Sequence, residues 1–356
     1  MGRKWVWPNK IKNIMKKKYQ ILILVLSVVL SSYISLSYSD NYFETSKNID
    51  IFTSLYKELN TYYVDRTDPG ILMKEAIDAM LKSLDPYTQY IPESEVEDFR
   101  LQTTGQYGGI GAMITKIEDY VVISEPYEGF PAQKAGLLPG DRIIEINGVN
   151  AKGKSTEDVS KILRGQPNTS VTLLINRPHI EQSFKVSFNR EKVFVPSVPY
   201  SAYISDGIGY VRLNSFTKNC ANNVKSSIME LKNEQNLEGL ILDLRGNPGG
   251  LLNESVDIVN LFIEKGVEVV NTKGKIKSWD KSYVASKNPL DIDVPLVVLI
   301  NSASASASEI VSGAIQDLDR GVIIGQRSFG KGLVQQTRKL PYNSQLKLTV
   351  AKYYIP

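Results

Sequence analysis

The spacing of apolar residues divides the chain into segments of different kinds. Residues 21–38 open with an almost wholly apolar run, and residues 41–95 carry apolar side chains at helical spacing. Residues 96–190 change to short β-type runs separated by glycine turns, and residues 191–356 alternate strand and helix patterns. The pattern predicts a multidomain α/β protein with one strongly apolar segment near its N-terminus.

The apolar run from Ile21 to Leu36 directly follows Lys16-Lys17-Lys18. About 17 helical residues are just enough to cross the hydrocarbon core of a bilayer. Because basic flanks stay on the cytoplasmic side, we expect residues 1–20 to be a cytoplasmic tail and residues 21–38 a single-pass anchor in the cell membrane. The alternative is a cleaved signal peptide, but no Ala-x-Ala-like cleavage site follows the run. Either arrangement puts the functional part outside the cytoplasm, on the periplasmic side.

Residues 41–95 are predicted to form an N-terminal helical region. Two sets of apolar residues recur at helical spacing: Ile51, Leu55, Leu59 and Tyr62, then Ile71, Ala76, Ile77, Met80 and Leu84. Asp68-Pro69-Gly70 breaks the two helices, and Asp85-Pro86-Tyr87-Thr88 ends the second one with a turn. We interpret this region as a helical hairpin that carries no chemistry.

The two following regions differ in how strands and helices combine. In residues 96–190 the strands Val121–Ile123 and Val171–Ile175 accompany helical patches at Pro131–Ala135 and Ser155–Leu163, the second capped by Ser155 or Thr156. In the C-terminal region we expect strands at Gly207–Leu213, Leu240–Leu244, Pro295–Ile300 and Val322–Ile324, and helices at Leu251–Ile263 and Ser304–Leu318. The strand Pro295–Ile300 is all apolar, so it should be buried on both faces.

Composition and charge exclude several classes of function. The net charge is only +4, and seven of the basic residues precede position 19, so the charge does not indicate nucleic-acid binding. One cysteine, Cys220, and one histidine, His179, exclude an intrachain disulfide and a site built from several Cys and His ligands. His179 is far from any nucleophile motif, and we interpret it as a solvated turn residue. No metal or organic cofactor is expected.

A glycine-rich run precedes the first β pattern of the 96–190 region. It comprises Gly108, Gly109, Ile110, Gly111 and Ala112, and glycines there leave backbone N–H groups free to hold a carboxylate. Downstream stands PAQKAGLLPGDRIIEING, residues 131–148, and the combination resembles a bacterial PDZ domain, a small β-barrel with helices. The resemblance implies that a peptide adds as a strand beside residues 110–114 and docks its C-terminal carboxylate on the glycines. The alternative is a PDZ fold that only stabilises the chain.

A serine-rich turn follows the predicted buried strand. Residues 301–310 read NSASASASEI, and these small residues allow a sharp turn from strand into helix that exposes a serine at the helix N-terminus. Backbone N–H groups at a helix start can stabilise a developing oxyanion. The plain alternative is a capped helix. From the residues alone, the choice among the neighbouring serines stays open.

A serine nucleophile needs a base, and Lys331 is one candidate. It lies in Ser328-Phe329-Gly330-Lys331-Gly332, a glycine-flanked loop between two strands. Burial in an apolar site would favour the neutral amine and lower the pKa of the lysine. The alternative is an ordinary surface lysine.

Residues 41–356 together resemble the carboxyl-terminal processing proteases, also called tail-specific proteases. The matching runs are DPYTQY at 85–90, the PDZ segment, LDLRGNPGG at 242–250, SASEI within 304–310, and SFGKGLVQ at 328–335. The resemblance implies that residues 96–190 are a PDZ domain and that residues 191–356 are an α/β protease core of the ClpP/crotonase-like type.

The resemblance also implies roles for individual residues. In that family the nucleophile stands 25 residues before the lysine, which selects Ser306. Gln335 is then expected to orient the amine of Lys331. The N–H groups of Ala307 and of Gly249 or Gly250, with Gly250 preferred, are expected to form the oxyanion hole. Glu309 and Asp317 match supporting positions near the site. For the two glycines the alternative is a turn that merely needs glycine.

The sequence departs from the family in two places. The family more often has Asp-Pro-His-Ser where this chain has Asp85-Pro86-Tyr87-Thr88, a difference that should leave the catalytic residues untouched. The family also continues with further strand and helix where this sequence ends at Pro356, so we expect the core to be truncated there.

The function implied is that of a serine endopeptidase with a Ser306–Lys331 dyad. Its partners would be proteins or peptides with free C-termini and, through the N-terminal helix, the membrane; homo-oligomers are left open. One rival is an inactive PDZ peptide-binding scaffold, and another is a crotonase-type acyl-CoA enzyme. Arg164, just after the predicted helix Ser155–Leu163, is a candidate regulatory residue that couples the PDZ domain to the protease body. The plain alternative for Arg164 is an exposed arginine favoured by the helix dipole.

Overall fold

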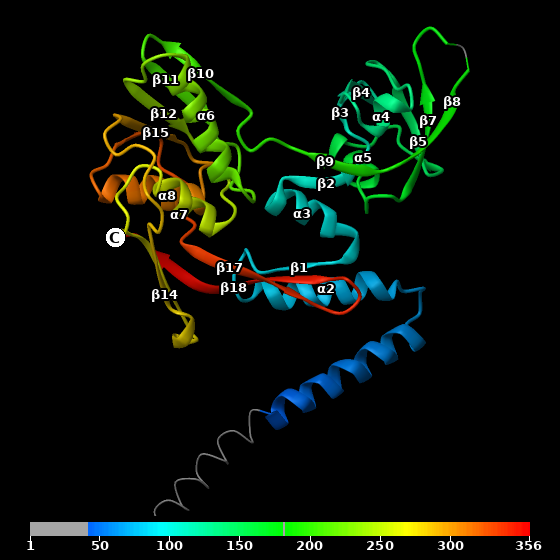
Figure 1. Ribbon diagram of the computed structural model, residues 1–356. Helices are drawn as coiled ribbons and strands as arrows, with labels where there is room; N and C mark the ends of the chain where they lie inside the picture. The colour runs from blue at the N-terminus through cyan, green and yellow to red at the C-terminus, as the bar shows by residue number, and fades with distance from the viewer. Residues whose placement is uncertain (1–41, 181) are drawn as a thin grey trace, which may run out of the picture. The chain divides into compact units, whose positions relative to one another are not determined.

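The computed structural model describes residues 42–180 and 182–356, and it divides into a unit ending at Ile77 and a larger unit from Asp78 to Pro356 (Figure 1). The basic tail 1–20 and the expected membrane segment 21–38 lie outside the described residues. Among residues 42–180 and 182–356, no helix is both long and apolar enough to span a bilayer.

The first unit contains two helices, as the apolar spacing predicted. Residues 42–62 form the first, and its apolar side chains, among them Leu55, are largely exposed. The second, α2 (Pro69–Lys82), begins at the predicted break, because the Asp68 carboxylate accepts the N–H groups of Gly70 and Ile71 at 2.8 and 3.0 Å. The run Asp68-Pro69-Gly70 therefore separates the two helices and forms the beginning of the second one.

The predicted helical region 41–95 also contains a strand, which follows the turn at residues 85–88 and was not predicted. Residues Gln89–Ile91 form strand β1, which pairs with the C-terminal strand β18 (Gln345–Tyr354). A short 3-10 helix, η1 (Glu93–Glu95), and α3 (Val96–Thr104) follow. The turn before β1 is thereby carried into the larger unit, next to the strands that end the chain.

Residues 112–189 form a sheet in the strand order β3-β4-β5-β7-β8. The elements of this domain are β3 (Ala112–Ile117), β4 (Tyr120–Pro126), α4 (Pro131–Lys134), β5 (Arg142–Ile146), β6 (Val149–Asn150), α5 (Thr156–Leu163), β7 (Ser170–Asn176) and β8 (Phe184–Asn189). Its own core includes Ile123, Ile143, Leu173 and Val159. Ser155 caps α5 by accepting the Asp158 N–H at 3.1 Å. A separate ribbon of β2 (Gln106–Gly109) and β9 (Glu191–Phe194) flanks the domain.

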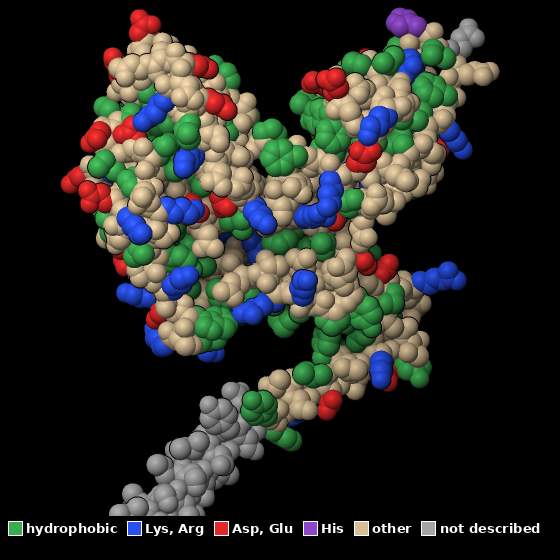
Figure 2. Space-filling view, viewed as in Figure 1, with side chains coloured by type: hydrophobic (Ala, Val, Ile, Leu, Met, Phe, Trp, Pro, Cys, Tyr) green, Lys and Arg blue, Asp and Glu red, His purple; other side chains and the backbone are tan. Residues whose placement is uncertain are grey.

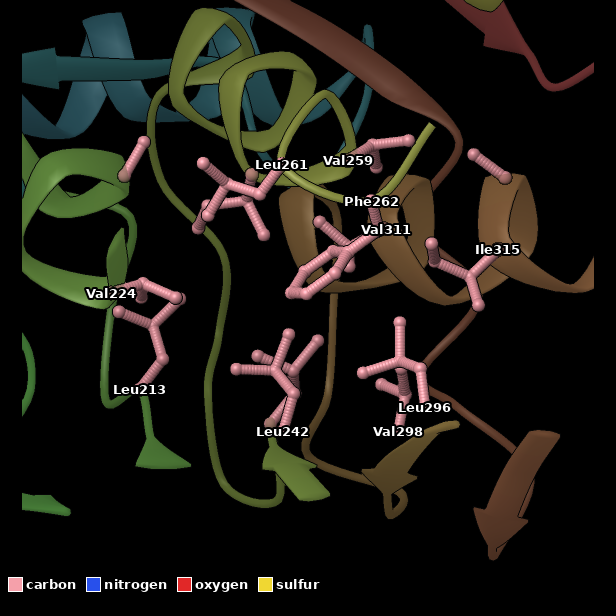
Figure 3. Close-up of a cluster of buried hydrophobic side chains, with 14 of the residues drawn as sticks. Leu213, Val224, Leu242, Val259, Leu261, Phe262, Leu296, Val298, Val311 and Ile315 are labelled. Atoms are coloured by element: carbon pink, nitrogen blue, oxygen red, sulfur yellow. The ribbon is translucent and has the colours of Figure 1, made fainter. Parts of the chain in front are cut away.

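Residues 200–325 are built on a second sheet in the order β10-β11-β12-β15-β16, in which the last four strands run parallel. Its elements are β10 (Tyr200–Ser205), β11 (Ile208–Arg212), α6 (Cys220–Glu234), β12 (Gly239–Asp243), α7 (Leu252–Val259), β15 (Leu296–Ile300), α8 (Ala307–Asp317) and β16 (Val322–Gly325). Side chains of the strands and of α6, α7 and α8 meet in one core that contains Leu242, Phe262, Val298 and Val311 (Figure 3). The predicted order of strands and helices is present.

Two of these elements differ from the expectation at their ends. Helix α8 starts at Ala307, three residues later than predicted, because Ser304 to Ser306 form the turn before it. Strand β15 is not buried on both faces: Leu296 and Val298 are buried, while the alternate residues are partly exposed. The N-terminal end of α8 thus stands at the carboxyl end of a central parallel strand, where ligands of such sheets bind.

A third sheet joins segments far apart in the sequence. Its order is β1-β18-β13-β14, and β17 pairs with β18. The remaining elements are β13 (Glu268–Gly274), the 3-10 helix η2 (Lys277–Trp279), β14 (Lys281–Val284) and β17 (Leu333–Lys339). This sheet carries the loop of Lys331 at the start of β17 and brings the turn before β1 alongside it.

Candidate active site

A cavity of about 630 Å³ lies where the two five-stranded sheets and α3 meet. Its wall includes Ser306 and Ala307 at the start of α8, Lys331 before β17 and Gln335 on β17. Phe99 and Thr103 of α3 form part of the same wall. This size is typical of a ligand pocket. The structure therefore brings the predicted serine and the predicted lysine to one cavity.

Ser306 occupies a strained position in the turn between β15 and α8. Its backbone has φ 55° and ψ −109°, a conformation that non-glycine residues rarely adopt. Such strain is tolerated where surrounding contacts hold it, and it is a feature of turns that present a nucleophile. Here the Gly249 backbone holds the turn closely: a Cβ at Gly249 would lie 2.6 Å from the Ala305 oxygen and 3.0 Å from Ser306 Cβ.

The neighbouring serines are buried and already committed to backbone oxygens. Ser304 Oγ donates to the Leu244 carbonyl at 2.8 Å, and Ser308 Oγ donates to the Asn247 carbonyl at 2.9 Å. Ser306 is the serine of this alternating run that lines the cavity. The structure thus separates Ser306 from Ser304 and Ser308 on grounds independent of sequence resemblance.

Glu309 links the serine turn to the lysine loop. Its carboxylate accepts the Ser306 N–H at 2.6 Å and the Lys331 N–H at 2.9 Å. It also accepts the Ser328 hydroxyl at 2.8 Å and the Gly330 N–H at 2.6 Å. Four donors from two loops converge on one side chain, so Glu309 fixes the backbone of Ser306 relative to that of Lys331.

The amine of Lys331 is held by a chain of hydrogen bonds. Nζ donates to Gln335 Oε1 at 3.0 Å, and Gln335 Nε2 donates to the Tyr87 carbonyl at 2.7 Å. Nζ also lies 4.6 Å from the centre of the Tyr87 ring. The interpretation that residues 41–95 carry no chemistry is therefore wrong at Tyr87, and the turn at 85–88 does reach the candidate catalytic lysine.

The surroundings of Lys331 favour its neutral form. Burial lowers the pKa of Lys331, and the positive charge of Lys347 lowers this pKa further. The carboxylates of Asp85 and Glu309 act in the opposite direction, more weakly. Within the described residues, no hydrogen bond joins Lys331 Nζ to Ser306 Oγ; the amine is bound to Gln335.

Two residues near Ser306 that line the cavity, Ala307 and Gly250, have backbone N–H groups with no acceptor among the hydrogen bonds of the described residues. Ala307 is the first residue of α8, so its N–H has no acceptor inside the helix. Gly250 forms a parallel bridge with Phe216, in which Phe216 N–H donates to the Gly249 oxygen and Leu251 N–H donates to the Phe216 oxygen. The Gly250 N–H takes no part in this bridge and points away from Phe216. Gly249, Gly250 and Ala307 all line the cavity.

Asp317 does not belong to this site, contrary to the expectation. It is the last residue of α8 and is exposed. It is the eleventh residue after Ser306, and eleven steps of helical rise correspond to about 16 Å. The family match placed Asp317 near the site by sequence position, whereas the direction of α8 carries it to the far end.

The glycine-rich run is split between two elements. Gly108 and Gly109 belong to β2, and the Gly108 N–H already donates to the Glu97 carboxylate at 3.2 Å. Ile110 and Gly111 form the turn into β3. The expectation that all these N–H groups are free is therefore wrong for Gly108. Residues 110–112 lead directly into β3. This strand lies at the edge of its sheet, and α5 contacts it.

Arg164 bridges the domain of residues 112–189 and α3. Its Nη1 lies 2.6 Å from Asp98 Oδ1, and its guanidinium lies 5.2 Å from the centre of the Tyr107 ring. Asp98 belongs to α3, whose next residue, Phe99, lines the cavity. A contact of Arg164 with an acid is thus present, and α3 connects that contact to the cavity wall.

We expect Arg164→Ala to reduce proteolysis strongly, about 10-fold or more, if the contact positions α3. Peptide affinity and melting temperature should change little, because a partly exposed ion pair contributes about 0–1 kcal/mol. Lys134→Ala is the matched control, since the Lys134–Glu191 pair at 3.0 Å involves no residue of α3. Wild-type cleavage rates in Arg164→Ala would leave only the plain interpretation of a surface arginine.

The remaining reactive side chains lie away from the cavity. His179 is exposed, and Figure 2 shows the histidine at the protein surface. Cys220 is fully buried at the start of α6, and burial raises the pKa of its thiol. In the part of the chain that the structure describes, no group of His, Cys, Asp and Glu side chains is arranged to hold a metal ion.

Comparisons with known proteins agree with this architecture. The model of peptidase family S41 matches residues 207–356, and a PDZ domain model matches residues 122–177. The chain is 35% identical over 360 residues to a probable CtpA-like serine protease of Staphylococcus aureus, covering 98% of this chain and 71% of that protein. It is 36% identical over 344 residues to a carboxy-terminal-processing protease of Bartonella bacilliformis, covering 95% and 79% respectively.

Among solved structures, the photosystem II D1 C-terminal processing protease is 30% identical, with coverage of 86% of this chain and 88% of that one and a TM-score of 0.46. The match to peptidase family S41 and the match to a PDZ domain model define the class: a serine peptidase with a PDZ domain. The chain belongs to peptidase family S41 and is a carboxy-terminal processing protease.

Proposed function

We propose that Ser306 is the nucleophile of this protease, that Lys331 is its general base and that Gln335 orients the base. The observation that carries the proposal is that Ser306 and Lys331 line one cavity while a single carboxylate, that of Glu309, binds the backbones of both. The lowered pKa of Lys331 supports it, because a lysine must be neutral to accept a proton.

The reaction follows from these roles. Neutral Lys331 accepts the proton of Ser306 Oγ as the oxygen attacks a peptide carbonyl, and the N–H groups of Ala307 and Gly250 stabilise the oxyanion. The lysine ammonium then protonates the departing amine, which leaves an ester on Ser306. Water, deprotonated by Lys331, hydrolyses the ester. For the first step Lys331 Nζ has to move from its place beside Gln335 to within hydrogen-bond reach of Ser306 Oγ. We expect this movement when substrate binds, because catalytic hydrogen bonds often tighten only in the substrate complex.

The PDZ domain supplies recognition of peptide C-termini. We propose in addition that the substrate adds as a strand along β3 and that its carboxylate meets the turn of Ile110, Gly111 and Ala112. Two features support this: β3 is the open edge of its sheet, and α5 lies next to it. In this scheme the PDZ domain holds the substrate end while the chain upstream enters the cavity.

The location of the protein is a separate proposal. We propose that residues 21–38 anchor the chain in the cell membrane with the protease outside the cytoplasm, supported by the apolar run and its preceding lysines. Deleting residues 1–40 should move the protein from the membrane fraction to the soluble fraction. Recovery of the full chain in the soluble fraction would contradict the anchor.

The experiment that tests the proposed dyad incubates the protein with peptides of varied C-termini, wild type beside Ser306→Ala. Cleavage should require Ser306. The rival hypothesis of an inactive PDZ scaffold predicts peptide binding without cleavage in both proteins. Membership of family S41 leaves no support for a crotonase-type acyl-CoA enzyme.

Cleavage should also rise with pH. Below the pKa of Lys331 the ammonium cannot accept a proton, so the rate increases as pH rises through this pKa and then levels off. Because burial and Lys347 lower the pKa, the rise should occur at lower pH than for an ordinary lysine. Lys347→Met removes one of these causes and should move the rise to higher pH. A rate that falls steadily between about pH 6 and about pH 9, in a folded enzyme, would contradict a lysine base.

A further inference from the structure

A second lysine, Lys347, lines the same cavity as Ser306 and Lys331. It lies on β18, where its Cα is paired with Gln89 of β1 and with Thr337 of β17. Side chains alternate between the faces of a strand, and Gln335 and Thr337 of the neighbouring strand also line the cavity. The register of three strands therefore directs Lys347 to the side of the sheet that carries the candidate catalytic groups.

Lys347 has no anionic partner in the structure. No carboxylate of the described residues lies within 4.0 Å of its ammonium, which lies 5.9 Å from the centre of the Phe99 ring. Burial lowers the pKa of Lys347 as well as that of Lys331. A half-buried cation without a counter-charge is costly, since it loses water without gaining an ion pair.

The charge of the cavity wall is one-sided. The residues that line it include Lys331 and Lys347 but no aspartate, glutamate or arginine. Lys331 has to be neutral for catalysis, whereas no step of the proposed mechanism needs a neutral Lys347, and an anion bound beside Lys347 would favour its charged form. Substrate that enters the cavity displaces water from around this cation, and the group that best compensates the loss is an anion.

We propose that Lys347 binds a carboxylate of the substrate inside the active-site cavity, making it a specificity-determining residue. The carboxylate belongs either to an Asp or Glu side chain near the scissile bond or to the C-terminus of a short peptide. The proposal rests on the proposed function of this cavity, because it assumes that the peptide to be cleaved occupies it. It concerns a site separate from the glycine turn of the PDZ domain.

Matched peptides test the proposal. One pair differs only by Glu or Gln beside the scissile bond and has an amidated C-terminus; another pair differs only by a free or amidated C-terminus. For wild type, kcat/KM should favour the carboxylate member of one pair by about 10-fold to 100-fold, the effect of one hydrogen bond to a charged group. A preference for a free C-terminus can also arise at the PDZ domain, so the pair whose preference falls when Lys347 is replaced identifies the source of the carboxylate.

Two substitutions and one control then assign the preference to Lys347. In Lys347→Met, which keeps an apolar stem, the Glu/Gln ratio should fall to about one and the free/amidated ratio should fall to the part that the PDZ domain contributes. Lys347→Glu should prefer a Lys-bearing peptide over its Glu counterpart. Lys352→Met is the control, because Lys352 is exposed on the same strand and does not line the cavity. The ratios compare two substrates on one enzyme, so a general loss of catalytic power does not affect them.

Binding measurements separate failure of this inference from failure of the proposed function. The same peptides are titrated against Ser306→Ala and against Ser306→Ala combined with Lys347→Met, which share one PDZ domain. A carboxylate preference that disappears with Lys347 supports the inference even if the catalytic assignment is wrong. Equal binding and cleavage of both members of every pair in wild type, or preferences that Lys347→Met leaves unchanged, would overturn it.

Discussion

Replacing either Ser306 or Lys331 by alanine is expected to abolish peptide cleavage, with a loss of at least about 10³-fold in kcat. Removing Ser306 Oγ removes the attacking atom, and removing Lys331 Nζ removes the only base of the proposed mechanism. Both side chains face the cavity, so their truncation should leave the fold intact. Cleavage is measured on one peptide for all variants, and the melting temperature shows that each variant is folded.

Three further variants make this prediction specific. Lys331→Arg keeps a positive charge but cannot accept a proton, so it should be as inactive as Lys331→Ala. Ser304→Ala and Ser308→Ala remove buried hydrogen bonds to backbone carbonyls. They should lower stability by about 1 kcal/mol while the remaining folded enzyme still cleaves. Normal cleavage by Ser306→Ala, together with loss of cleavage in folded Ser304→Ala or Ser308→Ala, would show that another serine is the nucleophile.

Periodicity alone was sufficient to predict most elements of the protease sheet. The strands β11 and β15 and the helix α7 fall within the predicted segments, because apolar residues there face one contiguous core. The start of α8 was predicted three residues early, since serine and alanine at 304–306 are equally compatible with a helix and with a turn. The positive φ of Ser306 depends on the close approach of Gly249, which no local pattern reveals.

The parts of the site that the sequence did not reveal depend on contacts between distant segments. Tyr87 meets Gln335 across 248 residues, and the pairing of β1 with β18 that permits the contact left no periodic signal in a three-residue strand. Lys347 was overlooked for the same reason: it is one of many lysines, and only the strand register places it in the cavity. The Ser–Ala repeat and the glycine-flanked lysine, by contrast, were visible because they are local.

Glu309 was expected only as a supporting residue, and its four hydrogen bonds give it a larger part. They join the N–H of Ser306 to Ser328, Gly330 and Lys331 through one carboxylate. All four partners are donors, and a carboxylate is an acceptor at both oxygens. In Glu309→Gln an NH₂ group replaces one carboxylate oxygen, and this group cannot accept hydrogen bonds from the donors around it. At least one of the two loops therefore loses a hydrogen bond that holds it in place. Because Ser306 has a strained backbone, loss of its anchor should let the turn relax and move Oγ.

We therefore expect Glu309→Gln to lower kcat by about 10²-fold with KM changed by less than about twofold, since displacing catalytic groups by about 1 Å costs this much. The melting temperature should fall as well, so the loss of kcat has to be measured where the variant is folded. Glu254→Gln is the matched control: the Glu254 carboxylate accepts the N–H groups of Asn219 at 2.7 Å and Ala221 at 3.0 Å at the start of α6, and it does not line the cavity. This control should lose stability to a similar extent while keeping kcat. If Glu309→Gln kept wild-type kcat, or if both variants lost kcat in proportion to stability, the carboxylate would have no specific part in positioning Ser306 and Lys331.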